Sequence, residues 1–298
     1  MWQKIVSFFM AIIAFFASLF GINVSKNPNV NIFKDLSYGT EQRQKLDLYL
    51  PKNASGSTGL YLAIHGGAWI SGDKTNCPES ILYTVSGDMG FAAATMNYRY
   101  ISEAVSVNDI MDDIDSALRA IKAKGKEQGV DIDRVMLTGY SAGAHLSLLY
   151  GYSRKDSAPM KIAFVASNSG PTNLADVNFY NGSCSDLGDA NSICSLMSMA
   201  CGKAFTPETF DDAVPALLKA SPVSYVSPTC PPTLIAHGEK DSIVPYSNAT
   251  SLDNALTAAG VKHDLVPYPN SNHGLESDKE SAERYETLLF EYVNTYLK

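Results

Sequence analysis

The stretch RVMLTGYSAGAHLSLLY, residues 134–150, decides the fold, because it has the pattern of a buried strand, a tight turn and a helix in direct succession. Within it, GYSAG at residues 139–143 matches G-x-S-x-G, in which a serine occupies a sharp, strained strand-to-helix turn. Glycines stand on both sides because side chains there would clash with neighbouring backbone. The turn lifts the Ser141 hydroxyl above the sheet, at the positive end of the next helix. We therefore predict Ser141 as a nucleophile; a plain tight turn is the alternative.

A serine hydroxyl is a weak nucleophile and needs a neighbouring base. The chain has five histidines, and His273 lies in PYPNSNHGLE, a loop between the last expected strand and the last expected helix. That place gives it freedom to face Ser141, so we predict His273 as the base. Structural roles are expected for the other histidines, which lie at strand ends or one helical turn after Ser141: His65, His145, His237 and His263.

The base in turn needs a carboxylate that fixes its tautomer and stabilises the imidazolium. Asp241 follows the expected strand 232–238 in HGEKDSIVP, at the sheet edge where Ser141 is also expected. The chain order would then be nucleophile, acid and base, Ser141, Asp241 and His273. Glu239 is the alternative acid, with a solvated turn as its other interpretation.

The segment HGGAW, residues 65–69, follows another buried strand. Consecutive glycines allow backbone N–H groups to approach a substrate closely, as stabilisation of an oxyanion requires. We expect one oxyanion donor at the N–H of Ala142. The second should come from the 65–69 loop, with Gly67 first and Ala68 or Gly66 as alternatives.

Two aromatic side chains beside these motifs are candidates for the substrate pocket, Trp69 and Tyr140. Trp69 either lines the pocket or packs on its own loop. His65 is expected to brace that loop. The following GDK, residues 72–74, is either a surface turn or a salt-bridged brace.

Buried strands and helical patterns alternate after residue 40, which predicts an α/β fold: a mostly parallel central sheet covered by helices on both faces. A helix with Ser106 as N-cap and an apolar face from Val107 to Ile121 is expected, and a last helix over residues 285–296. The segment 172–221 lacks a strand signal and is predicted to be a cap over the site. The strands are expected at residues 46–50, 60–66, 91–99, 134–140, 161–169, 232–238 and 263–268.

The N-terminal segment is uncharged from Ile5 through Ser25. We predict a secretory signal peptide or a retained membrane anchor at residues 1–25, a buried core helix being the third possibility. Residues 26–45 would hold a linker and the first strand region, and residues 46–298 the catalytic domain. Either main interpretation makes the protein secreted or extracytoplasmic.

Charge and cysteine usage narrow the partners. Lys and Arg number 23 against 31 Asp and Glu, a net charge of −8, and no basic run exists, so a nucleic-acid partner is not expected. Three of the five cysteines fall between Cys184 and Cys201, and their spacing matches no zinc site. In an exported protein we expect disulfides that staple an exposed loop; buried free thiols are the alternative.

In order and spacing, HGGAW, GYSAG, HGEKDSIVP and NSNHG resemble the α/β-hydrolase superfamily from about Asp35 to the end of the chain. HGGAWISGDK and MNYRY more closely resemble a secreted carboxylesterase group related to hormone-sensitive lipase and the bacterial feruloyl and acetyl esterases (BD-FAE-like). This resemblance implies the triad Ser141, Asp241 and His273. It implies a serine carboxylesterase for short acyl or aromatic esters, with no metal and no cofactor. Besides small-molecule esters, the expected export and the acidic net charge also fit an ester substrate on an extracellular polysaccharide. The sequence departs from the hormone-sensitive-lipase pattern at Ala68 and Ala144, where glycine is usual.

Two other functions fit parts of the sequence. One is amide hydrolysis, by an arylformamidase-like enzyme or a prolyl-oligopeptidase-like peptidase, which use the same turn. The other is a non-catalytic binding module on the hydrolase fold, although such relatives usually lose a triad member, and all three are present here.

Overall fold

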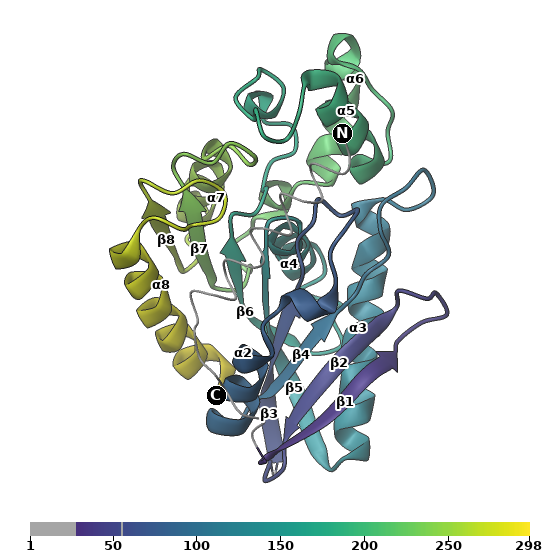
Figure 1. The fold of residues 1–298 in the computed structure, drawn as a ribbon, viewed down its shortest axis with the longest axis vertical. Helices are drawn as coiled ribbons and strands as arrows, with labels where there is room; N and C mark the ends of the chain where they lie inside the picture. The colour runs from purple at the N-terminus through teal and green to yellow at the C-terminus, as the bar shows by residue number, and fades with distance from the viewer. Residues whose placement is uncertain (1–27, 55) are drawn as a thin grey trace.

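The computed structural model describes residues 28–54 and 56–298 (Figure 1). The predicted signal or anchor segment, residues 1–25, lies outside the described residues. Across the part that is described, no helix combines the length and the apolar character that a membrane span requires.

One eight-stranded sheet runs through the molecule in the order β1-β2-β4-β3-β5-β6-β7-β8. The first two strands pair antiparallel, and β2 also runs antiparallel to β4, whereas every other neighbouring pair is parallel. The predicted α/β fold with a mostly parallel sheet is therefore confirmed. The strands are β1 (Val30–Ser37), β2 (Lys45–Pro51), β3 (Gly56–Ile64), β4 (Ala92–Met96), β5 (Val130–Tyr140), β6 (Lys161–Asn168), β7 (Thr233–Gly238) and β8 (His263–Tyr268).

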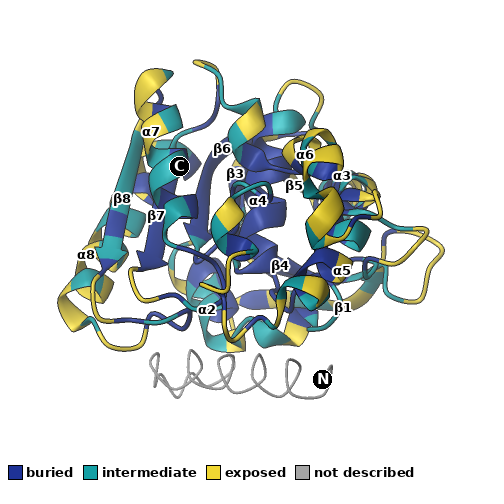
Figure 2. Cartoon of the chain, turned by 90° about the horizontal axis from the view of Figure 1, so that it is seen from above, coloured by how far each residue is buried: buried dark blue, intermediate teal, exposed yellow. Residues whose placement is uncertain are grey.

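Helices cover both faces of this sheet, so its central strands are apolar on both sides. Along β4, for example, Ala92 and Ala94 pack in one hydrophobic cluster with helices α3 (Val107–Glu127) and α4 (Ala142–Ser153). Ala93 between them packs in a second cluster with helices α2 (Glu79–Tyr83) and α8 (Lys279–Tyr292). Figure 2 shows the buried strands at the centre and the exposed residues on the outer faces of the helices. The helices are α2 (Glu79–Tyr83), α3 (Val107–Glu127), α4 (Ala142–Ser153), α5 (Ala190–Cys201), α6 (Phe210–Lys219), α7 (Ser247–Ala258) and α8 (Lys279–Tyr292).

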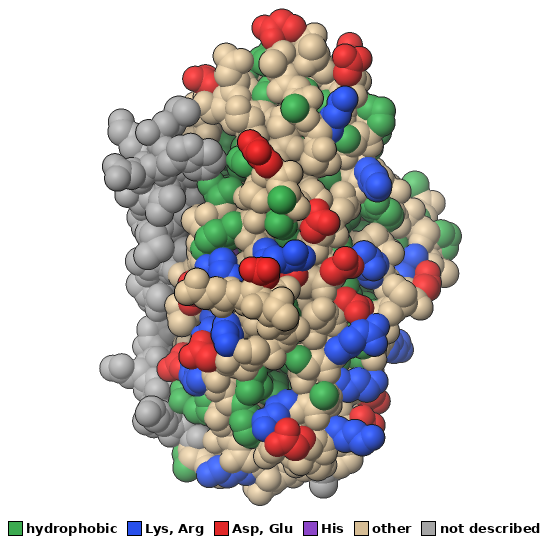
Figure 3. All heavy atoms as spheres, turned by 90° about the vertical axis from the view of Figure 1, so that its right-hand side faces the viewer, with side chains coloured by type: hydrophobic (Ala, Val, Ile, Leu, Met, Phe, Trp, Pro, Cys, Tyr) green, Lys and Arg blue, Asp and Glu red, His purple; other side chains and the backbone are tan. Residues whose placement is uncertain are grey.

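Helix α3 begins where the sequence predicts. The Ser106 N–H donates to the Asp109 side chain at 2.8 Å, and the two residues form a capping box. The apolar face from Val107 to Ile121 is buried against the sheet. Figure 3 shows acidic and basic side chains interspersed on the side of the molecule that carries α3. Asp112 of α3 forms an ion pair with Arg154 at 2.9 Å.

The segment 172–221, called the cap below, contains α5 and α6 and the short 3₁₀ helix Val177–Phe179. Figure 1 shows α5 and α6 at one end of the molecule, above the ends of the central strands. The sequence gives no strand signal here, and the structure has helices in its place.

The predicted disulfides are wrong, because all five cysteines are free thiols. Cys194 and Cys201 lie on one helix, α5, seven residues apart, which is about 10 Å along a helix axis. A disulfide needs Cα atoms within about 7 Å, so these two cannot pair. Two of the other three thiols have local acceptors: Cys184 donates to the Asn178 carbonyl, and Cys230 to a carbonyl five residues earlier in the chain.

Candidate active site

Ser141 occupies the turn between β5 and α4 with φ 55° and ψ −121°, and its side chain is buried. Such a backbone conformation costs a residue with a side chain about 1–3 kcal/mol and persists only when the surroundings impose it. The Ser141 N–H donates to the Asn168 carbonyl at 2.8 Å. A Cβ on Gly143 would lie 2.0 Å from the Ile64 carbonyl oxygen, so the helix can approach β3 only with glycine here.

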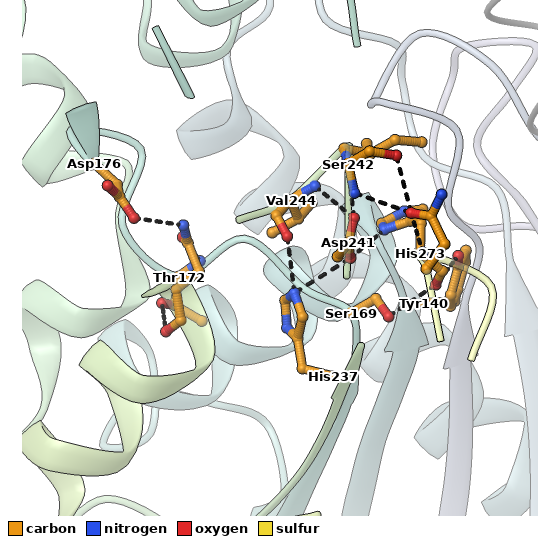
Figure 4. A network of polar contacts seen from close by, with 12 residues as sticks. Tyr140, Ser169, Thr172, Asp176, His237, Asp241, Ser242, Val244 and His273 are labelled. Atoms are coloured by element: carbon orange, nitrogen blue, oxygen red, sulfur yellow. Dashed lines mark hydrogen bonds and ion pairs between the residues drawn. The ribbon is translucent and has the colours of Figure 1, made fainter. Parts of the chain in front are cut away.

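His273 and Asp241 form a buried pair (Figure 4). Nδ1 of His273 donates to Oδ2 of Asp241 at 2.7 Å, and neither side chain is exposed. Oδ1 of Asp241 accepts the N–H groups of Ile243 and Val244 at 2.9 and 2.8 Å. Burial alone would raise the pKa of Asp241, but the neighbouring imidazoles lower it well below its usual range. The carboxylate is therefore charged and fixed at neutral pH, as an orienting acid must be. The alternative acid, Glu239, is exposed.

The loop that carries His273 is fastened beside the nucleophile. The Tyr140 hydroxyl donates to the His273 carbonyl at 2.6 Å, and the two rings lie 5.0 Å apart. Ser169, which follows β6, donates its hydroxyl to the same carbonyl at 2.9 Å. Residues that adjoin Ser141 in sequence and in the sheet thus hold the histidine loop against the turn. Tyr140 is not among the residues that line the pocket described below; it contacts His273 instead.

The 65–69 loop approaches Ser141 through three consecutive residues with positive φ: Gly67 at 111°, Ala68 at 49° and Trp69 at 60°. The Gly67 carbonyl accepts the N–H groups of the residues three and four positions later, which closes the turn. Ala68 lines the same pocket as Ser141 and Ala142. Ala142 is the first residue of α4, and the first N–H groups of a helix have no intrahelical acceptor, so the Ala142 amide is available to an oxyanion. Gly67, the first choice from the sequence for the second donor, is not among the residues that line this pocket.

Gly66, the other candidate donor, packs directly on the nucleophile turn. A Cβ at Gly66 would lie 2.8 Å from the Tyr140 carbonyl and 3.4 Å from the Ser141 Cβ. Glycine is therefore required at residue 66 for the 65–69 loop to approach the turn at Ser141 this closely.

The pocket in front of Ser141 is small and apolar. Its cavity volume is about 20 Å³, which is close to the space that a single water molecule needs. The cap supplies four of its lining residues, so the expected placement of this segment over the site agrees with the structure. The pocket is lined by Ala68, Trp69, Ser141, Ala142, Pro171, Phe179, Leu187, Leu196, Met197, Ile243 and Val244.

His65 braces the 65–69 loop, as the sequence suggests; this segment is called the oxyanion loop below, after its proposed role. Its Nδ1 donates to the Gly66 carbonyl at 2.7 Å, its Nε2 accepts from the Arg43 guanidinium at 3.3 Å, and its ring stacks on Tyr98. Burial lowers the pKa of His65 from 6.5 to about 4, so the imidazole is neutral at pH 7.

The GDK turn is a brace and not a plain surface turn. Lys74 is buried, and its Nζ lies 2.8 Å from Asp47 and 3.1 Å from Asp35. Asp73 accepts the Asn97 side-chain amide at 2.8 Å. These contacts tie the end of the loop to β1, β2 and the residue after β4.

His145 is buried in the core, yet it also contacts the site, which sequence reasoning missed. Its Nδ1 accepts the indole N–H of Trp69 at 3.2 Å, and its Nε2 donates to the Ala220 carbonyl at 2.8 Å. Trp69 lines the pocket, and its ring packs edge-on against His145 of α4.

His237 is a second contact of the acid that sequence reasoning did not identify. Its Nε2 lies 3.3 Å from Oδ2 of Asp241 and 3.0 Å from the Val244 carbonyl (Figure 4). The spacing of His237 and Asp241 in HGEKD is the signal that could have suggested it. His263 lies apart from this group, paired with Asp253 at 3.2 Å.

Comparison with known proteins places these features in context. Residues 46–256 match the BD-FAE family. The isoprenylcysteine alpha-carbonyl methylesterase of Arabidopsis thaliana is 28% identical, over 80% of this chain and 56% of its own length. Esterase LipQ of Mycobacterium tuberculosis is 29% identical, over 81% of this chain and 57% of its own length. The chain thus spans little more than half the length of these relatives.

Among solved structures, a truncated carbohydrate esterase from gut microbiota superimposes with a TM-score of 0.70 at 21% identity, covering 90% of this chain and 99% of that one. At this level of identity the likeness shows a shared fold.

Proposed function

Because this chain belongs to the BD-FAE family and has the α/β-hydrolase fold, we propose that it is a carboxylic ester hydrolase with Ser141 as nucleophile, His273 as base and Asp241 as the acid that orients the base. The observation that carries the proposal is the buried His273–Asp241 hydrogen bond of 2.7 Å beside the strained Ser141 turn. A strained backbone and a buried carboxylate are costly for folding alone, and both are expected where a nucleophile is activated.

The geometry supports a two-step reaction through an acyl-enzyme. Since Nδ1 of His273 donates to Asp241, Nε2 is the nitrogen that accepts the Ser141 proton while the serine oxygen attacks the ester carbonyl. The amides of Ala68 and Ala142 stabilise the resulting oxyanion. His273 then gives the proton to the departing alcohol. In the second step it takes a proton from water, which attacks the acyl carbon, and it then returns this proton to the Ser141 oxygen as the carboxylic acid leaves.

The pocket favours a short acyl group. Apolar side chains surround Ser141, and the cavity of about 20 Å³ leaves little room beyond a methyl or ethyl group. Leu196 and Met197 of α5 close it from the cap side. We propose acetyl or similarly short esters as substrates. A saccharide as the alcohol is supported by two neighbours of known structure, the carbohydrate esterase from gut microbiota and an acetyl ester-xyloside bifunctional hydrolase.

Export is part of the same proposal. The uncharged segment 5–25 has the composition of a signal peptide or an anchor, which suits an enzyme that acts on extracellular esters. Mass spectrometry of the mature N-terminus separates the cleaved form from the anchored one, and an intact N-terminus in a cytoplasmic fraction would contradict both.

The direct test uses p-nitrophenyl esters from C2 to C12, with acetylated xylan and methyl ferulate. We expect turnover to be fastest at C2–C4, and covalent labelling by a fluorophosphonate that Ser141→Ala abolishes. Ser153→Ala, on the same helix with its hydroxyl bonded back to the Leu149 carbonyl, is the matched control and should keep both.

Two outcomes would overturn the assignment. Faster turnover of an anilide than of the matching ester would favour amide hydrolysis. Absence of any labelling of folded protein would favour a binding module.

A further inference from the structure

His145 connects three parts of the molecule that meet behind Ser141. It lies in the first turn of α4, where its own N–H donates to the Ser141 carbonyl at 3.0 Å. One ring nitrogen accepts from Trp69 of the oxyanion loop, and the other donates to Ala220 at the end of α6. Both partners fix the same neutral tautomer, with the proton on Nε2. The imidazole is fully buried, so neither bond can be replaced by bulk water.

The loop that His145 contacts is held in an unfavourable backbone conformation. Ala68 and Trp69 both have positive φ, and each such residue costs about 1–2 kcal/mol. The Trp69 carbonyl accepts the Ile101 N–H at 3.0 Å, and its indole is held by His145 at 3.2 Å. Because Ala68 precedes Trp69 directly, rotation of Trp69 would turn the peptide that carries the proposed oxyanion donor.

The Ala220 contact reaches the base of the cap, where that segment leaves the body and returns to it. The neighbouring Ser221 hydroxyl accepts the Leu174 N–H at 2.8 Å and donates to the Leu217 carbonyl at 2.7 Å. The two ends of the cap are therefore fastened together beside the carbonyl that His145 holds. A single side chain links the cap base to the oxyanion loop.

We propose that His145 is a positioning residue, which sets the oxyanion loop through its hydrogen bond to Trp69 and couples that loop to the base of the cap. The proposal rests on the proposed esterase function. His145 does not touch the substrate in this role; it determines where the Ala68 amide lies when charge develops on the carbonyl oxygen. Misplacement of catalytic groups by about 1 Å can cost about 100-fold in rate.

The test compares His145→Leu, which removes both hydrogen bonds, with His145→Gln, which retains an acceptor and a donor. We expect His145→Leu to lower kcat by about 10- to 100-fold and to leave KM for a short p-nitrophenyl ester within about 3-fold. Affinity for a trifluoromethyl ketone, whose adduct with Ser141 carries an oxyanion, should fall by the same factor as kcat. His145→Gln should recover most of both losses.

Leu256→Ala on α7 is the matched control, because it removes a buried core side chain away from the loop. It should lower stability and leave kcat and ketone affinity unchanged. In a Trp2→Phe background, Trp69 is the one tryptophan left in the chain. Its fluorescence should shift in His145→Leu, recover in His145→Gln and stay unchanged in Leu256→Ala.

If His145→Leu does not fold, Trp69→Phe breaks the same hydrogen bond from the other side and should show the same fall in kcat. Wild-type kcat and ketone affinity in the folded His145→Leu protein, or in Trp69→Phe, would overturn the positioning role. If Leu256→Ala lowered kcat and ketone affinity as much as His145→Leu does, the effect would be one of general destabilisation, and the positioning role would also be overturned. The proposed function fails separately, through an inert wild-type enzyme that no fluorophosphonate labels.

Discussion

The stability of the fold should depend on acid through two buried neutral histidines, His65 and His145. Each ring accepts a hydrogen bond from a donor, the Arg43 guanidinium or the Trp69 indole, so a second proton on either ring would face an N–H group. Burial lowers the pKa of each from 6.5 to about 4. As pH falls below 6.5 the unfolded chain takes up these protons first, and stability falls until the folded protein also binds them near pH 4.

The size of the effect follows from the pKa values. A difference of about 2.5 pKa units corresponds to about 3 kcal/mol per histidine once both states are protonated. At pH 5 the loss relative to pH 8 is about 2 kcal/mol for each histidine, or about 4 kcal/mol together. That is a large share of a typical unfolding free energy of about 5–15 kcal/mol.

Urea unfolding at pH 8 and pH 5, followed by circular dichroism, measures the difference. His145→Gln and His65→Gln should each shrink the difference between the two pH values by about 2 kcal/mol, whatever their stability at pH 8. The carboxylates that also titrate are common to all three proteins and cancel in this comparison. A difference between pH 8 and pH 5 that is the same in the wild type and both variants would refute the reasoning.

Three further outcomes are expected. Asp241→Asn should lower kcat by about 10⁴-fold, because an amide can hold the wrong tautomer of His273; stopped-flow ester hydrolysis measures this, and an unchanged rate would remove Asp241 from the triad. Met197→Ala should move the preference to longer acyl chains, each methylene that fits the enlarged pocket adding about 1–3 kcal/mol of transition-state binding. Met199→Ala is the control, because Met199 lies on the same helix and does not line the pocket; it should leave the C2–C12 profile unchanged. Identical profiles in the two variants would place the acyl group elsewhere. A thiol reagent should titrate five cysteines in denaturant without reductant. It should react slowly with the native protein, because burial raises the pKa of Cys184 to about 12. Fewer than five reactive thiols in denaturant would restore the disulfide interpretation.

The parts of the fold that follow from local patterns were predictable. Continuous apolar runs predicted β3 to β8 to within a few residues, and Ser106 marks the start of α3. Residues 139–143 and 65–69 were recognisable because turns between buried strands and helices restrict which residues fit. The pairing of His273 with Asp241 could be predicted from topology alone, since both follow parallel strands at one edge of the sheet.

Contacts between distant side chains could not be read from these patterns. Trp69 and His145 are 76 residues apart, and nothing local to either indicates that their rings meet. The cysteines were misjudged because their spacing in the sequence does not show that Cys194 and Cys201 point from different turns of one helix. The residues that shape the pocket in the cap, such as Phe179 and Met197, depend on how α5 folds over the sheet, and this is decided by tertiary packing.

Because the cap is inserted between β6 and β7, the residues proposed for catalysis and the residues that shape the acyl pocket lie in different segments of the chain. The proposed reacting groups come from the segments after β5, β7 and β8. One wall of the acyl pocket comes instead from the cap, whose two ends are joined by the hydrogen bond between Leu174 and Ser221. A cap of different length or sequence could therefore be exchanged at these two residues. The resulting chimaeras would keep the reacting groups of this chain and take the acyl specificity of the protein that supplied the cap.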